Sequence, residues 1–148
     1  MELLILDLDG TLFDTSERWN ICKQMTKTKK DFWDCYQSPK FMHLDKPRQE
    51  VINLVKEIIA KRNPVVIVIS GRSEKQLNET IRQLNEIGIF PSEIILRKEK
   101  DFRKDFEFKK EELEKLRRKY TPERITFTCK TNNKLSLQSE ITAVITEA

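Results

Sequence analysis

The 148-residue sequence predicts one α/β domain of three layers, in which helices cover both faces of a parallel sheet. Two observations predict it: short runs that are apolar throughout, and stretches of helical periodicity that separate these runs. Continuous apolar runs are typical of parallel strands that are buried on both faces. A chain of this length is too short for two independent cores, so we expect a single domain over residues 1–148, with a small cap-like insertion at residues 15–45.

The first strand is expected at Leu3–Leu6, where four apolar residues are followed by acids and a glycine. Residues 15–45 are polar and rich in aromatic side chains, and we expect two short helices there. Thr15 or Ser16 is a suitable cap for the first helix, because a hydroxyl accepts a hydrogen bond from a free amide of the first turn.

The next helix is expected directly after Pro47, where apolar residues recur at the spacing of one helical face. The β-branched run Val65–Ile69 then predicts a central parallel strand. A further helix is expected to end at Gly88, since glycine favours the left-handed conformation that stops helices. The remaining expected elements are a strand at 93–96, a helix at about 105–119, and strands at 125–129 and 141–146.

Composition indicates a cytoplasmic protein without a membrane partner or an obligate protein partner. Hydrophobic residues make up 38% of the chain and charged residues 35%, which allows one core beneath a densely charged surface. No apolar run approaches the roughly 20 residues that span a bilayer. Glu2 lies where a signal peptide carries positive charge. The net charge of +4 favours the approach of an anionic substrate.

The cysteines and the histidine exclude several kinds of site. Cys22, Cys35 and Cys129 are odd in number and widely spaced, so we expect buried or idle thiols, with neither a disulfide framework nor a zinc site. His43 is the only histidine, which excludes mechanisms that need a histidine cluster.

Two carboxylates follow the first strand, in Asp7-Leu8-Asp9-Gly10-Thr11. Acids held together at the end of a strand repel each other, and a divalent cation would relieve that repulsion. Oxygen ligands favour Mg²⁺. Gly10 allows the backbone to turn sharply and to approach a ligand. The alternative is an ordinary acidic turn.

A second motif, Ser70-Gly71-Arg72, follows the second expected strand. A hydroxyl, an unhindered amide and a guanidinium at the start of a helix are suited to binding phosphate. The alternative is a serine helix cap followed by a glycine turn.

A lysine lies on the apolar face of the helix at about 105–119. The residues sharing that face by helical spacing are Phe106, Lys109, Leu113, Leu116 and Tyr120. If this helix packs on the sheet, Lys109 is directed toward Asp7 and Ser70. The alternative is that Lys109 extends along the apolar surface into solvent.

These motifs, in this order, resemble the haloacid dehalogenase (HAD) superfamily of phosphohydrolases. The closest resemblance is to the 3′-phosphatase domain of polynucleotide kinase and its small phage-type relatives, and it covers about residues 1–120. It implies a Rossmann-like, HAD-like fold. The matching segments are 6–12, 31–34 with Pro47, 70–74, 96–97, and 101–105 followed by Lys109.

The resemblance implies a role for each site residue and Mg²⁺ as the cofactor. Asp7 would attack phosphorus and hold the metal, while Asp9 would act as general acid and base and bind the metal through its carbonyl. Ser70 would bind a phosphoryl oxygen, and Lys109 would stabilise the developing charge. The residues implied in substrate binding are Gly71, Arg72, Arg97 and Thr11.

The implied function is a magnesium-dependent phosphomonoesterase that acts on nucleotides or on nucleic-acid 3′-phosphate ends. One feature departs from the family: residues 127–133 carry no acid, where relatives have one or two metal ligands. The candidates for weaker metal ligands are Asp105, Thr128 and Asn132. Alternatively, Lys130 could place a positive charge near the position of the missing acids. An alternative is therefore a catalytically impaired binding or regulatory protein on this fold.

A third hypothesis is a nucleic-acid-binding module in residues 15–45. It would use lysines for phosphates and tryptophans for base stacking, and the residues are Lys23, Lys27, Lys29, Lys30, Trp19 and Trp33. The alternative is an ordinary solvated helix face.

Overall fold

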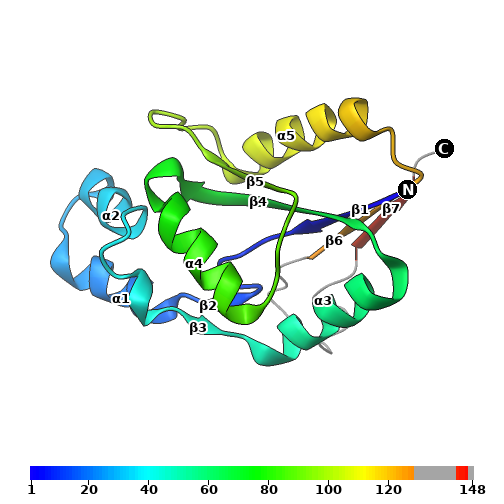
Figure 1. Cartoon of the computed structure of the whole chain (residues 1–148). Coiled ribbons are helices and arrows are strands. Elements are labelled where there is room, and N and C mark those ends of the chain that lie inside the picture. The colour runs from blue at the N-terminus through cyan, green and yellow to red at the C-terminus, as the bar shows by residue number, and fades with distance from the viewer. Residues whose placement is uncertain (129–142, 147–148) are drawn as a thin grey trace.

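The computed structural model describes residues 1–128 and 143–146, which form a five-stranded sheet between two layers of helices (Figure 1). The strand order is β5-β4-β1-β6-β7, and the first four strands are parallel. The predicted α/β class with a parallel sheet is confirmed, with β7 added antiparallel to β6 at the edge. The strands are β1 (Glu2–Leu6), β4 (Val65–Ser73), β5 (Glu93–Arg97), β6 (Arg124–Phe127) and β7 (Ala143–Thr146).

The alternation of side chains along β1 divides the core into two parts. Leu4 and Leu6 pack with α3 (Gln49–Arg62) and α4 (Leu77–Ile87) on one face of the sheet. Leu3 and Ile5 pack on the other face with α5 (Asp105–Tyr120). In Figure 1, α5 lies on the opposite side of the sheet from α3 and α4. A strand covered on both faces needs apolar residues at every position, which explains the continuous run.

The helices lie where periodicity predicts them, with one error on α5. Gly88 ends α4 at φ 76°, as expected for a glycine cap. On α5, the inclusion of Phe106 in the buried face is wrong, because Phe106 is 74% exposed and Phe108 is buried in its place. Phe106 lies in the first turn of the helix, where spacing alone does not define the buried face. None of the helices in the described ranges combines the length and apolar character that crossing a membrane requires.

The predicted insertion after β1 contains the two expected helices. Its ends are joined by a two-stranded antiparallel ladder, in which Phe13 pairs with Pro47. The expected hydroxyl cap of α1 is wrong, because Thr15 makes no capping bond and the Asp14 carboxylate accepts the Ser16 amide at 2.9 Å. The elements are β2 (Phe13–Asp14), α1 (Ser16–Met25), α2 (Lys29–Tyr36), a 3₁₀ turn (Met42–Leu44) and β3 (Lys46–Pro47).

A disulfide joins the two helices of the insertion. Cys22 of α1 and Cys35 of α2 are bonded, with their Cα atoms 5.7 Å apart, so the expectation of idle thiols is wrong for this pair. The chain reverses between the two helices and brings positions 13 residues apart into contact, which spacing alone does not reveal. Cys129 lies outside the described residues.

Reducing the Cys22–Cys35 bond is expected to destabilise the protein. Closing a loop of about 15 residues restricts the unfolded chain by about 3 kcal/mol. In thermal unfolding with and without dithiothreitol, the reductant should lower the melting temperature by about 2–4 °C for each kcal/mol of destabilisation. The double variant Cys22→Ala/Cys35→Ala is the control, since reductant should leave its melting temperature unchanged. An equal reductant effect on both proteins would contradict a stabilising disulfide.

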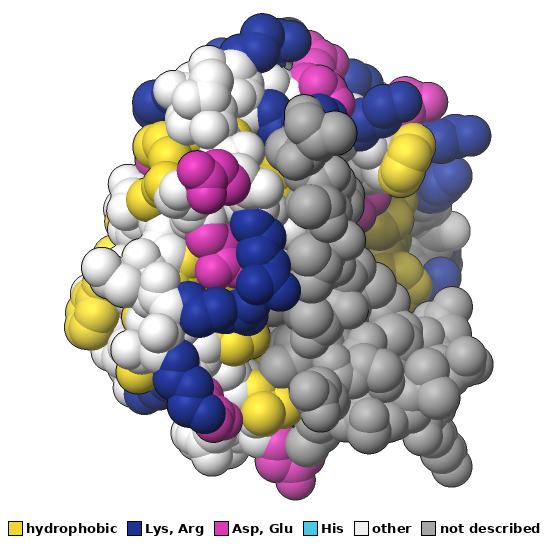
Figure 2. All heavy atoms as spheres, turned by 90° about the vertical axis from the view of Figure 1, so that its right-hand side faces the viewer, with side chains coloured by type: hydrophobic (Ala, Val, Ile, Leu, Met, Phe, Trp, Pro, Cys, Tyr) yellow, Lys and Arg dark blue, Asp and Glu magenta, His cyan; other side chains and the backbone are white. Residues whose placement is uncertain are grey.

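Positive and negative side chains are mixed on the face where the strands begin. Figure 2 shows this face, with Lys and Arg side chains beside Asp and Glu side chains. Arg62 lies 3.6 Å from Glu2, at the start of β1. On α3, Lys61 lies 2.6 Å from Glu57. Both of these cations are therefore paired with carboxylates.

Candidate active site

The site residues lie where the chain changes direction across the sheet. From β1 the chain passes through α3 and α4 to β4 and β5, and then returns through α5 to β6 on the other side of β1. Ligands of open α/β sheets bind at the carboxyl ends of the strands at such a switch point. Asp7 follows β1 directly, and α1 and α2 lie at this end of the sheet in Figure 1.

The Lys109 ammonium lies between two carboxylates. Its Nζ is 3.1 Å from Asp7 Oδ1 and 2.9 Å from Asp105 Oδ2. Thr11 donates its hydroxyl to Asp7 Oδ2 at 3.3 Å. The structure thus brings Lys109 to Asp7, as expected from packing this helix on the sheet, and adds Thr11 as a further partner of Asp7.

Burial controls the protonation of this pair. Desolvation raises the pKa of Asp7 above its usual 3.8, and Lys109 only partly offsets this effect. Burial alone would lower the pKa of Lys109, but the carboxylates of Asp7 and Asp105 outweigh it and raise the pKa above its usual value. Burial thus favours the neutral form of Asp7, while the two carboxylates favour the protonated form of Lys109.

Thr128, at the end of β6, holds the main chain of Asp7. Its hydroxyl oxygen accepts the Asp7 amide at 2.6 Å, and its own amide donates to the Ile5 carbonyl at 2.9 Å. The first position after β6 is thus occupied by a neutral hydroxyl that fixes Asp7. The other positions suggested for the fourth motif, Lys130 and Asn132, lie outside the described residues.

Two buried arginines hold one oxygen of Asp9. Arg18 Nη2 donates to Asp9 Oδ1 at 3.1 Å, and Arg72 Nε donates to the same atom at 2.9 Å. Within the described residues, Asp9 Oδ2 has no hydrogen-bond partner. Asp9 is therefore fixed through Oδ1, while Oδ2 remains available for contact with a bound molecule.

Asp45 completes the network beneath Asp9. Its side chain is fully buried, with Oδ1 3.0 Å from Arg18 Nε and Oδ2 3.4 Å from Arg72 Nη2. Desolvation raises the pKa of Asp45, and the two arginines oppose this rise. Gln83 donates to Asp45 at 3.0 Å and accepts from Arg72 at 2.8 Å. The contact of Arg72 with the site is thus its hydrogen bond to Asp9.

Ser70 and Gly71 lie in the last part of β4 rather than at the start of a helix. The strand continues to Ser73, with an irregular register after Ile69. The Ser70 hydroxyl is buried and accepts the Arg72 amide at 3.1 Å. A Cβ at Gly71 would lie 2.7 Å from Asp105 Oδ1, so a larger residue here would displace the Asp105 carboxylate.

Arg97 organises the loop between β5 and α5. Its guanidinium lies 3.7 Å from Asp105 and 3.8 Å from Asp101, and covers the ring of Phe108 at 5.0 Å. It is 9% exposed. Direct contact with a substrate stays a prediction for four residues: Ser70, Gly71, Arg72 and Arg97.

Sequence reasoning missed Arg18 and Asp45. Arg18 shares a helical face with Cys22, four residues later, and both are fully buried. Arginine is rarely buried without partners. The spacing from Arg18 to Cys22 was the available signal. The partners of Arg18 lie after β1, at the end of α2 and directly after the 3₁₀ turn, so they are visible only after folding.

The fold brings two acids and a lysine together at the carboxyl end of β1. A nucleophile candidate follows the central strand, a second acid lies two residues later, and a lysine from a later helix contacts the first acid at 3.1 Å. The family model of the HAD superfamily, subfamily IIIB (acid phosphatase), matches residues 1–123. The chain belongs to this family, and the superfamily predicted from the motifs is confirmed.

One solved structure supports the predicted resemblance to polynucleotide kinase phosphatases. The chain is similar to part of a structure described as "Structure of Pnkp1/Rnl/Hen1 complex", with a TM-score of 0.53 and 26% sequence identity. The similarity covers 74% of this chain and 32% of the other, so this chain spans about a third of that neighbour's length. Among curated proteins, none matches.

Proposed function

We propose that this protein is a magnesium-dependent phosphomonoesterase that uses an aspartyl-phosphate intermediate and acts on nucleotides or nucleic-acid 3′-phosphate ends. The observation that carries the proposal is the contact of 3.1 Å between Lys109 Nζ and Asp7 Oδ1 at the switch point of the sheet. Membership of an acid phosphatase family supports the reaction class.

In the proposed reaction, Asp7 accepts the phosphoryl group and Asp9 transfers the protons. A carboxylate oxygen of Asp7 forms a bond to phosphorus while the bond from phosphorus to the ester oxygen breaks. Asp9 gives a proton to the leaving oxygen, and then takes one from the water that attacks the aspartyl-phosphate. Lys109 stabilises the negative charge that develops on the phosphoryl oxygens. The second step releases inorganic phosphate and regenerates Asp7.

The oxygen donors near Asp7 fit Mg²⁺, which commonly binds one or two carboxylates together with water and substrate phosphate. The Asp7 carboxylate and, by resemblance to the family, the Asp9 carbonyl would hold it. When bound, the ion would neutralise charge on the phosphate and orient it. Burial of Asp7 beside Asp9 raises its pKa, so a cation here would favour the reactive carboxylate form.

The second candidate is a catalytically impaired binding protein on the same fold. It is favoured by Thr128, which places a hydroxyl directly after β6. Within the described residues, no group of three or more His, Cys, Asp or Glu side chains could hold a metal.

Phosphate release from three kinds of substrate separates the two candidates. The substrates are p-nitrophenyl phosphate, mononucleotides, and matched oligonucleotides with a 3′- or a 5′-phosphate, each with Mg²⁺ and with EDTA. We expect Mg²⁺-dependent release, faster from the 3′-phosphate than from the 5′-phosphate. No release from any substrate, together with tight Mg²⁺-independent binding of a phosphorylated ligand, would establish the second candidate instead.

A further inference from the structure

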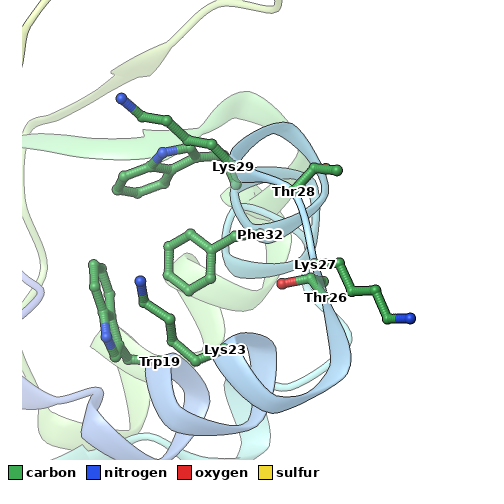
Figure 3. A pocket seen from close by; sticks show the side chains of 8 residues that line it. Trp19, Lys23, Thr26, Lys27, Thr28, Lys29 and Phe32 are labelled. Atoms are coloured by element: carbon green, nitrogen blue, oxygen red, sulfur yellow. The ribbon is translucent and has the colours of Figure 1, made fainter.

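The insertion carries an open groove of about 420 Å³ that combines aromatic rings with lysines (Figure 3). We call this the α1–α2 groove. Within the described residues, no acidic side chain lines it. Its rings and cations are Trp19, Phe32, Trp33, Lys23, Lys27 and Lys29.

The lysines of the α1–α2 groove have no anionic partner within residues 1–128 and 143–146, unlike Lys46, Lys61 and Lys119, which are paired. Lys23 Nζ lies 5.5 Å from the ring of Trp19 and 5.0 Å from the ring of Phe32, and Figure 3 shows it extending between them. Lys27 extends away from the rings in Figure 3. Among the described residues, none of the three groove lysines forms an ion pair. The groove therefore presents positive charge that a phosphate chain could neutralise.

The tryptophans offer stacking surface. Trp19 is 37% exposed and Trp33 is 38% exposed, and their rings meet edge to face with centroids 5.9 Å apart. More than a third of each tryptophan thus remains accessible. Accessible indole rings bind nucleic-acid bases with little sequence preference, because every base has a π-face.

A chain of contacts connects the α1–α2 groove to Asp9. Arg18, which holds Asp9, covers the ring of Tyr36 at 4.4 Å. The ring of Tyr36 lies 5.3 Å from that of Trp19. The Thr15 and Tyr36 hydroxyls are hydrogen-bonded at 2.8 Å, which joins the start of α1 to the end of α2 within the insertion. The side chains of Arg18, Tyr36 and Trp19 thus connect the groove to the acid expected to protonate the leaving group.

We propose that the α1–α2 groove binds single-stranded nucleic acid, so that the 3′-phosphate of the strand enters the Asp7 site. A base stacks on an exposed indole where Lys23 now lies, and Lys23, Lys27 and Lys29 pair with backbone phosphates. This inference rests on the proposed function and specifies its substrate as a strand rather than a mononucleotide.

Intrinsic fluorescence reports on this groove selectively, because Trp19 and Trp33 are the only tryptophans in the chain. The full-length Asp7→Asn variant is titrated with a 3′-phosphorylated oligothymidylate, so that binding is measured without turnover. We expect quenching by the oligonucleotide and much weaker quenching by an abasic oligomer of equal length. Equal binding of both oligomers would mean that the groove binds through charge alone, and this would overturn the stacking proposal.

Two sets of variants separate stacking from charge. Trp19→Ala should weaken binding about tenfold or more, whereas Trp19→Phe should preserve most of it. Lys23→Gln/Lys27→Gln/Lys29→Gln should reduce the dependence of log K on log salt by about 0.7 for each backbone phosphate that a lysine no longer neutralises. The matched control replaces three lysines that are paired with carboxylates: Lys61→Gln, Lys115→Gln and Lys119→Gln. An equal change in the control would overturn the assignment to the groove.

Kinetics distinguish failure of this inference from failure of the proposed function. The triple groove variant should raise KM for the 3′-phosphorylated oligonucleotide about tenfold or more, with kcat and the rate on p-nitrophenyl phosphate unchanged. An unchanged KM overturns the groove as a substrate site and leaves the phosphatase proposal intact. If no substrate releases phosphate, the phosphatase proposal fails, and the fluorescence titration alone decides whether the groove binds a strand.

Discussion

Replacing Asp7 with asparagine is expected to lower phosphate release by about three orders of magnitude or more, because the amide cannot attack phosphorus. Lys109 retains Asp105 as a partner at 2.9 Å, so the local structure should persist. The measurement is steady-state phosphate release at saturating Mg²⁺. Asp34→Asn is the control, because Asp34 forms an exposed ion pair on α2 and should leave the rate near that of the wild type.

The pH dependence of the same variant follows from the raised pKa of Asp7. Because folding raises this pKa above 3.8, the folded state loses stability as pH rises from 3.8 through the folded pKa. At neutral pH, the melting temperature of Asp7→Asn should therefore be at least as high as that of the wild type. In acid, any difference between the two melting temperatures should disappear. Wild-type activity should fall as pH drops through the folded pKa of Asp7. A variant that melts several degrees lower at neutral pH would contradict the assigned burial effect.

Replacing Arg72 with methionine is expected to have the largest effect on stability. It leaves Asp45, whose side chain is fully buried, with only one of its two arginines. Removing one partner of a buried ion pair typically destabilises a protein by about 3–5 kcal/mol. Thermal unfolding should show a decrease of about 2–4 °C in melting temperature for each kcal/mol.

The control for Arg72→Met is an arginine that forms only exposed ion pairs. Arg82 on α4 pairs with Glu79 and Glu86 at the surface. Exposed pairs contribute at most about 1 kcal/mol, so Arg82→Met should change the melting temperature little. Equal effects of the two substitutions would contradict a structural role for the network around Asp9.

The parallel sheet and the position of Asp7 at the end of a strand were predictable because both depend on local sequence. A continuous apolar run such as Leu3–Leu6 needs cover on both faces, and the polar residues that follow must lie at the strand end. Lys109 was predictable because it is a cation on an otherwise apolar helical face. Its contact with Asp7 then follows from packing α5 on the sheet.

Features that depend on contacts between distant segments were not predictable. The Cys22–Cys35 bond requires knowledge of how α1 and α2 pack together. In the sequence, Arg18 is indistinguishable from a surface arginine. Its ion pairs with Asp9 and Asp45 form only when the chain folds. The buried face of α5 was assigned through Phe106, although Phe108 fills the core, because the first turn of a helix has too few neighbours to define a face.

The most direct test of the account is to trap the phosphoryl group on the protein. The enzyme is mixed with a 3′-phosphorylated oligonucleotide and Mg²⁺, quenched in acid and treated with borohydride, which reduces an aspartyl-phosphate to homoserine. Peptide mass spectrometry should locate homoserine at position 7 in the wild type, and nowhere in Asp7→Asn. Rapid phosphate release with unmodified aspartate at position 7, or homoserine at another acid such as Asp105, would contradict Asp7 as the nucleophile.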